Sequence, residues 1–116
     1  MKQQAHLITL QRQAGLLARN LTALQLLCHS TTYAHRLDVL VTELHTIASR
    51  IDALEAISAT TRLNDPLEQT NRYSTALLVL LGSCPSTLTP TELAPMLSPV
   101  IRLLNQAEHQ NAEEVA

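Results

Sequence analysis

The chain has 116 residues, of which 46% are hydrophobic, 16% charged and 2% aromatic, and its formal net charge is -2. This length supports a single domain over residues 1–116. The charge balance argues against nucleic-acid binding, because phosphate contacts require a surplus of clustered Lys and Arg. The longest apolar run, residues 76–81, is far shorter than the roughly 20 residues of a membrane span, and residues 1–10 do not resemble a secretory signal. We therefore expect a cytoplasmic protein with no nucleic-acid partner and no membrane insertion.

Apolar residues in the first half of the chain recur at alternating steps of three and four, which places them along one seam of a helix. The first series is Leu7, Leu10, Ala14, Leu17, Leu21, Leu24 and Cys28, and the second is Leu37, Leu40, Leu44, Ile47, Ile51 and Leu54. These series predict helices over residues 4–28 and 33–58. Hydroxyl groups in residues 30–32 can cap the second helix near Tyr33, and so short a connection makes the pair an antiparallel hairpin.

The first helix also carries leucines off this seam, at Leu16, Leu26 and Leu27. A hairpin with one seam would leave them uncovered. We therefore expect the second half of the chain to cover the C-terminal half of the first helix on another side.

A third helix is predicted over residues 66–81. Its start signal is Asp65-Pro66-Leu67-Glu68, in which Asp suits the N-cap, Pro the first helical position and Glu the third. Gly82 permits the left-handed turn that ends many helices. Residues 76–81 are apolar on all faces of this helix, so they are either buried on every side or part of an interface.

The last element begins with Thr89-Pro90-Thr91-Glu92, a capping box with Pro at the first helical position. Pro95 and Pro99 each remove a backbone donor, which costs about 3 kcal/mol inside a helix. We therefore predict a kinked or broken helix over residues 90–109, with a second start at residues 98–99, and a frayed tail over 110–116. Its buried stripe is Leu97, Val100, Ile101 and Leu104. The fold class that follows is all-α, a bundle of four to five helices built on the N-terminal hairpin.

Residues suited to catalysis or metal binding are scattered. The five histidines, His6, His29, His35, His45 and His109, include no pair three or four residues apart, and the two cysteines, Cys28 and Cys84, form no C-x-x-C pair. We therefore expect no metal and no other cofactor. We interpret the cysteines as free thiols in a reducing cytoplasm, with one disulfide between them as the alternative. Without a nucleophile elbow, a glycine-rich phosphate loop or a paired carboxylate site, the chain is predicted to be no enzyme.

The segment Ala34-His35-Arg36-Leu37 is similar to the opening of the histidine phosphotransfer motif, A-H-x-L-K-G. This resemblance implies that His35 is a phosphoacceptor exposed on a helix. Asp38 and Val39 stand where that family has Lys and Gly, and a carboxylate at this place repels an incoming phosphoryl group. Phosphotransfer through His35 is therefore the alternative function.

Arg36, Glu43 and Arg50 recur at intervals of seven on the second helix. The opposing row of an antiparallel first helix is His6, Gln13, Asn20 and Leu27, which offers no formal charge to pair with them. The stripe is therefore either a solvated face or the rim of an interface.

The chain carries more apolar side chains than a thin two-helix hairpin can cover. This surplus predicts a protein-binding module. The predicted interface consists of Leu26, Leu27, Leu77, Leu78, Leu80, Leu81, Arg36, Glu43 and Arg50. The expected function is that of a bacterial or phage-type adaptor, a secretion or assembly chaperone, or a regulator that sequesters its target. The partner is another protein or a second copy of the chain. Inhibition of a larger complex is a further alternative.

Overall fold

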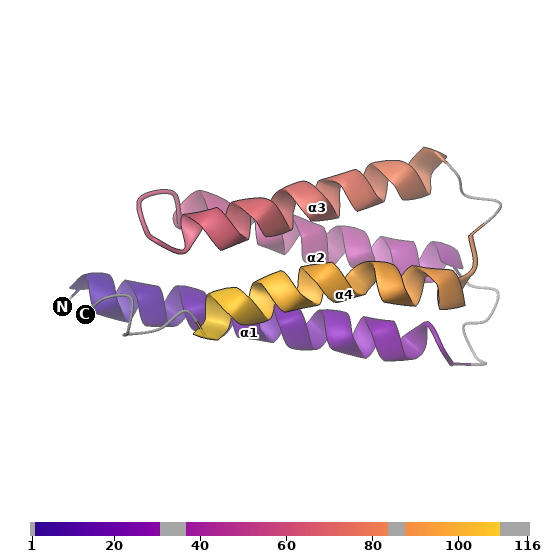
Figure 1. Cartoon of the computed structure of the whole chain (residues 1–116), viewed down its shortest axis with the longest axis horizontal. Helices are drawn as coiled ribbons and strands as arrows, with labels where there is room; N and C mark the ends of the chain where they lie inside the picture. The colour runs from indigo at the N-terminus through magenta and orange to yellow at the C-terminus, as the bar shows by residue number, and fades with distance from the viewer. Residues whose placement is uncertain (1, 31–36, 84–87, 110–116) are drawn as a thin grey trace.

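A computed structural model describes residues 2–30, 37–83 and 88–109 and contains four helices (Figure 1). They are α1 (Lys2–Leu27), α2 (Leu37–Ile57), α3 (Asn64–Ser83) and α4 (Pro90–His109). The all-α bundle predicted from the sequence is confirmed. Among the described residues, no helix is long and apolar enough to cross a membrane.

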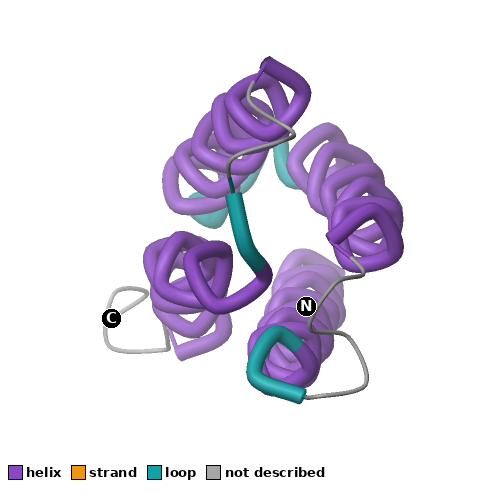
Figure 2. The backbone as a smooth tube through the Cα atoms, turned by 90° about the vertical axis from the view of Figure 1, so that its right-hand side faces the viewer, coloured by secondary structure: helices purple, strands orange, loops and turns teal. Residues whose placement is uncertain are grey.

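The helices lie at the four corners of an elongated bundle that measures 49 × 24 × 18 Å (Figure 2). Consecutive helices run antiparallel along the long axis (Figure 1). Contacts join α1 to α2, α2 to α3, α3 to α4 and α4 to α1, and the α1 to α4 contact is the most extensive. The helices α1 and α3 therefore occupy opposite corners, as do α2 and α4.

The core sits along the central axis and contains the seam residues that the sequence predicted. From the two series, Leu10, Ala14, Leu17, Leu21, Leu24, Cys28, Leu40, Leu44, Ile47, Ile51 and Leu54 are buried, while Leu7 and Leu37 pack against the core half-buried. In α4, Leu97, Val100 and Leu104 are buried and Ile101 is partly buried. Burial raises the pKa of the Cys28 thiol, so that thiol stays protonated near neutral pH.

The core face of α3 is more polar than expected. Thr70 and Ser74 are fully buried, and each satisfies its hydroxyl within the helix. The Thr70 hydroxyl donates to the carbonyl oxygen of Pro66 at 2.6 Å, and the Ser74 hydroxyl donates to the carbonyl oxygen of Thr70 at 2.8 Å. Such bonds remove the cost of burying an unpaired hydroxyl, which explains how α3 contributes small polar groups to an otherwise aliphatic core.

The capping box of α4 is confirmed. Glu92 accepts a hydrogen bond from the backbone N–H of Thr89 at 3.0 Å, and the N–H of Glu92 donates to the Thr89 hydroxyl at 3.3 Å. The start of α3 differs, because the helix begins at Asn64 and places Asp65 and Pro66 inside its first turn.

The predicted left-handed turn at Gly82 is wrong. Gly82 lies within α3, which continues to Ser83, and no described glycine has a positive φ. The predicted helix start near Tyr33, the tail over residues 110–116 and Cys84 fall outside the described residues.

Of the two forms predicted for the last helix, kinked or broken, the broken one is wrong, because α4 runs as one helix from Pro90 to His109 with Pro95 and Pro99 inside it. Two interior prolines cost about 6 kcal/mol. Burying one large aliphatic side chain returns about 1.5 to 3 kcal/mol. The helix buries Leu93, Leu97, Val100 and Leu104 completely, so packing against the core outweighs the two missing hydrogen bonds.

Candidate protein-binding groove

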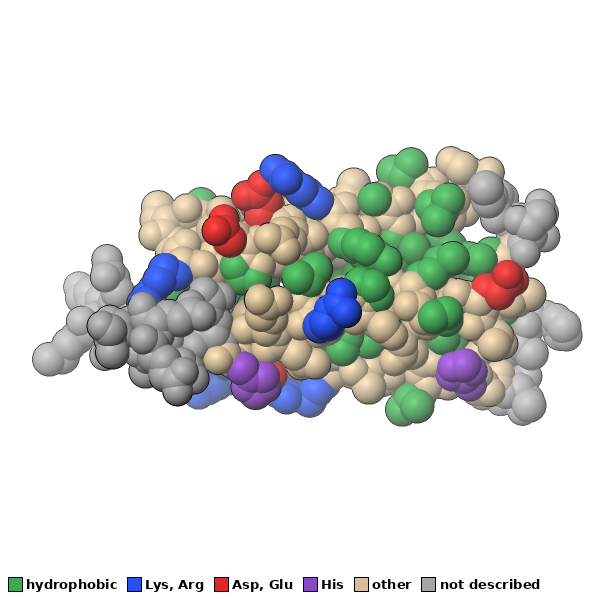
Figure 3. Space-filling view, in the orientation of Figure 1, with side chains coloured by type: hydrophobic (Ala, Val, Ile, Leu, Met, Phe, Trp, Pro, Cys, Tyr) green, Lys and Arg blue, Asp and Glu red, His purple; other side chains and the backbone are tan. Residues whose placement is uncertain are grey.

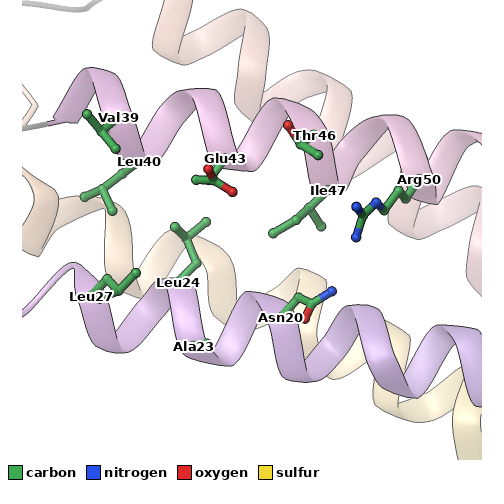
Figure 4. Close-up of a pocket in the computed structure, with 10 residues that line it drawn as sticks. All are labelled: Asn20, Ala23, Leu24, Leu27, Val39, Leu40, Glu43, Thr46, Ile47 and Arg50. Atoms are coloured by element: carbon green, nitrogen blue, oxygen red, sulfur yellow. The ribbon is translucent and has the colours of Figure 1, made fainter.

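A long groove separates α1 from α2. It consists of two adjoining hollows of about 390 and 320 Å³ that share Asn20 and Arg50. Its described lining, which defines the α1–α2 groove, is Gln13, Leu16, Leu17, Asn20, Ala23, Leu24 and Leu27 from α1 and Val39, Leu40, Glu43, Thr46, Ile47, Arg50, Ala53, Leu54 and Ile57 from α2. Figure 4 shows the larger hollow, with side chains of both helices directed into the space between them.

The groove stays open because α1 presents different residues to its two neighbours. Toward α4 it offers Gly15 and Ala18, and the carboxylate of Glu108 lies directly over Gly15. Small residues let helix backbones approach closely. Toward α2 it offers branched side chains such as Leu17 and Leu24, which fill the core beneath the groove and hold the two backbones apart.

Hydrogen bonds close the α4 side of α1 in the same way. The Gln25 side-chain amide donates to the carbonyl oxygen of Ala94 at 2.7 Å and to the Ser98 hydroxyl at 2.9 Å. Near the other end, Gln11 donates to the carbonyl oxygen of Ala107 at 3.3 Å. These bonds tie α1 to α4 near both ends of their contact.

Apolar side chains line the rims of the groove and reach solvent. Leu16 and Ile57 are 51% and 55% exposed, and Leu27 is 38% exposed. Among the residues that line the groove, there is no His and no Cys. The chemistry available here is therefore apolar contact with a few polar and charged groups.

The charges of the groove belong to Glu43 and Arg50, which lie seven residues apart on α2. Neither side chain makes an ion pair or a hydrogen bond within the described part of the chain. The side-chain carboxamide of Asn20 likewise makes no hydrogen bond within the described part of the chain. In Figure 4 the Arg50 side chain reaches from α2 toward α1, and Asn20 lies across from Thr46 and Ile47.

The structure brings together three of the residues predicted to form an interface, since Leu27, Glu43 and Arg50 all line the groove. It also places Gln13 and Asn20 opposite the charged stripe, as the antiparallel pairing predicted. Sequence reasoning missed Asn20 and Ile57 as site residues. The signal for Ile57 was available, because it continues the series of sevens that contains Glu43 and Arg50.

The remaining predicted interface residues lie elsewhere. Leu77 and Leu81 are buried in the core and Leu78 is half-buried, so the run over residues 76–81 is neither wholly internal nor wholly at the surface. Leu26 is 69% exposed and Leu80 is 48% exposed. They belong to helices at opposite corners, so they do not lie side by side on one surface of the bundle.

The second half of the chain covers the C-terminal half of α1 on another side, as expected, because α4 packs along α1 and accepts hydrogen bonds from Gln25. It does not cover Leu16, Leu26 and Leu27, which stay exposed. Arg36 and His35 lie outside the described residues.

Hydrophobic side chains also gather on the opposite face of the bundle, over α3 and α4 toward the end where α3 stops (Figure 3). The exposed members on α3 are Tyr73, Val79 and Leu80. The larger described hollows lie between α1 and α2 instead, so the α1–α2 groove is the better-formed candidate.

No group of three or more His, Cys, Asp or Glu side chains that could hold a metal occurs within residues 2–30, 37–83 and 88–109. Comparison with known proteins gives no match to a family model, a curated protein or a solved structure.

Proposed function

We propose that this chain is a non-catalytic protein-binding module that receives a helix in the α1–α2 groove. It would serve as an adaptor, as a secretion or assembly chaperone, or as a regulator that sequesters its target. The observation that carries this proposal is an open apolar groove whose two charged side chains, Glu43 and Arg50, have no partner among the described residues.

A helix suits this groove better than an extended peptide. The groove follows two helices and exposes side chains rather than backbone donors and acceptors, so it offers no edge for strand addition. An amphipathic helix laid along it would place side chains at intervals of three and four against Leu16, Leu27 and Ile57. Burying a large apolar side chain contributes about 1.5 to 3 kcal/mol, less for the part that is already covered.

A photoreactive amino acid at Ala23, which is exposed in the groove, tests the proposal in cells of the source organism. We expect irradiation to give a covalent product larger than the monomer. The same amino acid at Gln69, exposed on α3, is the matched control and should give little product.

The outcome that contradicts the proposal is equal capture by both positions, or no product from Ala23. A circular dichroism melt of each variant beforehand establishes that the bundle is intact. Leu27→Asp should reduce the product from Ala23, because it places a carboxylate on the apolar rim.

A further inference from the structure

The two charged residues of the α1–α2 groove can pair with the same two residues of a second copy of the chain. When two copies of one helix pack antiparallel about a two-fold axis, a residue before the centre of contact meets the residue equally far after it in the other copy. With the centre between Thr46 and Ile47, Glu43 of each copy meets Arg50 of the other. Each of these charged side chains then has a partner of opposite charge, and the symmetry gives two such ion pairs in the dimer.

We propose that the α1–α2 face docks against the same face of a second copy of this chain, with α2 antiparallel to α2 and α1 antiparallel to α1 about a two-fold axis that passes between Thr46 and Ile47. This inference rests on the proposed function, because the same face binds the partner, and it names that partner. A parallel arrangement would instead oppose like charges at both positions, which is unfavourable.

The same axis would bring the two Asn20 side chains together. The axis lies perpendicular to the helices, and Asn20 of α1 lies across the groove from Thr46 and Ile47 (Figure 4). A carboxamide both donates and accepts, so two copies of Asn20 can bond to each other. A single polar Asn within an apolar helix contact fixes register and orientation.

The apolar residues of α1 fit this arrangement. Counting outward from Asn20, Leu27 of one copy falls opposite Gln13 of the other, and Leu16 falls opposite Leu24, with Ala23 beside it. Leu24 is buried beneath the groove. Each exposed leucine would therefore pack over the neighbouring groove without meeting another exposed leucine.

The face is large enough for a stable dimer. The helix α2 has 21 residues, so it is about 31 Å long at a rise of about 1.5 Å per residue. The bundle measures 24 Å along its second-longest axis. Two faces of this length and width together bury at most about 1,500 Å², which reaches the range of specific protein interfaces.

Charge reversal with sedimentation equilibrium tests the pairing. We expect the wild type to dimerise at micromolar concentration. Glu43→Arg alone and Arg50→Glu alone should each weaken dimerisation at least tenfold, because each places like charges opposite one another. An equimolar mixture of these two variants should restore it, because Arg at position 43 and Arg50 of one chain then face Glu at position 50 and Glu43 of the other.

Several results would overturn the inference. One is a wild type that stays monomeric at high micromolar concentration, and another is single variants that dimerise as tightly as the wild type. A third is a mixture that stays monomeric. Leu80→Ser, on the opposite side of the bundle, is the matched control and should leave dimerisation unchanged.

Disulfide trapping gives an independent reading of the geometry. In a background with Cys84→Ser, Asn20→Cys should form an interchain disulfide under mild oxidation, whereas Arg12→Cys should not. Equal trapping at both positions, or trapping only at position 12, would contradict the axis at Asn20.

The two proposals can fail separately. A monomeric wild type combined with capture of a different protein by the Ala23 probe would overturn the dimer and support the protein-binding function. A monomeric wild type with no capture would contradict both.

Discussion

The helix α1 meets α4 and α2 along two sides that differ in almost every respect. Toward α4 it presents Gly15 and Ala18, and Gln11 and Gln25 donate across the contact. Toward α2 it presents branched side chains, an Asn20 side chain that has no partner among the described residues, and a groove that stays open to solvent. One side is closed by small residues and hydrogen bonds, and the other leaves apolar area and charge available.

This difference separates residues that stabilise the bundle from residues that can recognise a partner. The closed side has few groups available to a partner, because its polar side chains are hydrogen-bonded and its two helices pack closely. The open side keeps Leu16, Leu27 and Ile57 at the surface above a core of buried leucines. Substitutions on the two sides should therefore affect stability and association differently.

The largest effect is expected in the core that both sides share. Leu44 is 1% exposed, and Leu44→Asp would bury a carboxylate without a partner. The penalty is several kcal/mol against a total stability of about 5 to 15 kcal/mol. Circular dichroism should show loss of a cooperative melt. The neighbouring exposed change His45→Asp should leave the melt nearly unaltered, and equal effects would show that Leu44 is wrongly placed.

Enlarging a small residue on each side of α1 contrasts the two sides directly. Ala18 is buried on the strip that also carries Gln11 and Gln25, so Ala18→Leu should force α4 away and cost about 1 to 3 kcal/mol. Ala23→Leu extends into the open groove and should change the free energy of unfolding by less than about 0.5 kcal/mol. Urea titration of both variants measures the contrast. Similar costs would mean that the groove is not open.

The sequence predicts the closed parts of the molecule better than the open one. Burial at Leu21, Leu44 and Ile51 follows from helical spacing alone, because each lies on an unbroken seam. The uncovered position of Leu26 could not be predicted, since it depends on which side of α1 receives α4. That choice is set by Gly15 and Ala18, and their role becomes visible only when both helices are in place.

Two local rules failed. Pro95 and Pro99 favour a break, but the buried stripe of α4 holds the helix together. Gly82 favours a left-handed end, but α3 continues through it. For the groove, the residue spacing identified Glu43, Arg50 and the opposing row, whereas their lack of partners among the described residues needed the three-dimensional arrangement.

A smaller effect is expected from the hydrogen bonds that close the α4 side. Gln25→Ala removes the bonds to the Ala94 carbonyl and the Ser98 hydroxyl and should destabilise the bundle by about 1 kcal/mol. Gln13→Ala removes a side chain of the same kind from the groove and should alter stability by less than about 0.5 kcal/mol. Chemical unfolding distinguishes the two. If both substitutions lower the free energy of unfolding by the same amount, the hydrogen bonds of Gln25 do not stabilise the bundle.

The smallest effect concerns the two glycines, and here the sign is informative. A Cβ at Gly82 would meet nothing within 4 Å, and the residue is helical with no positive φ. Gly82→Ala should therefore stabilise the bundle by about 0.5 to 1 kcal/mol, because alanine loses less backbone entropy in a helix.

A Cβ at Gly15 would collide with the carboxylate of Glu108. Gly15→Ala would have to displace that carboxylate from Arg19, 3.6 Å away. The Arg19 side chain is exposed and that of Glu108 is partly buried. A pair at the surface contributes little, so a small gain or none is expected there. Differential scanning calorimetry measures both. A destabilised Gly82→Ala would restore the left-handed helix end that the sequence predicted, and a Gly15→Ala as stable as Gly82→Ala would show that α4 approaches α1 less closely than the structure has it.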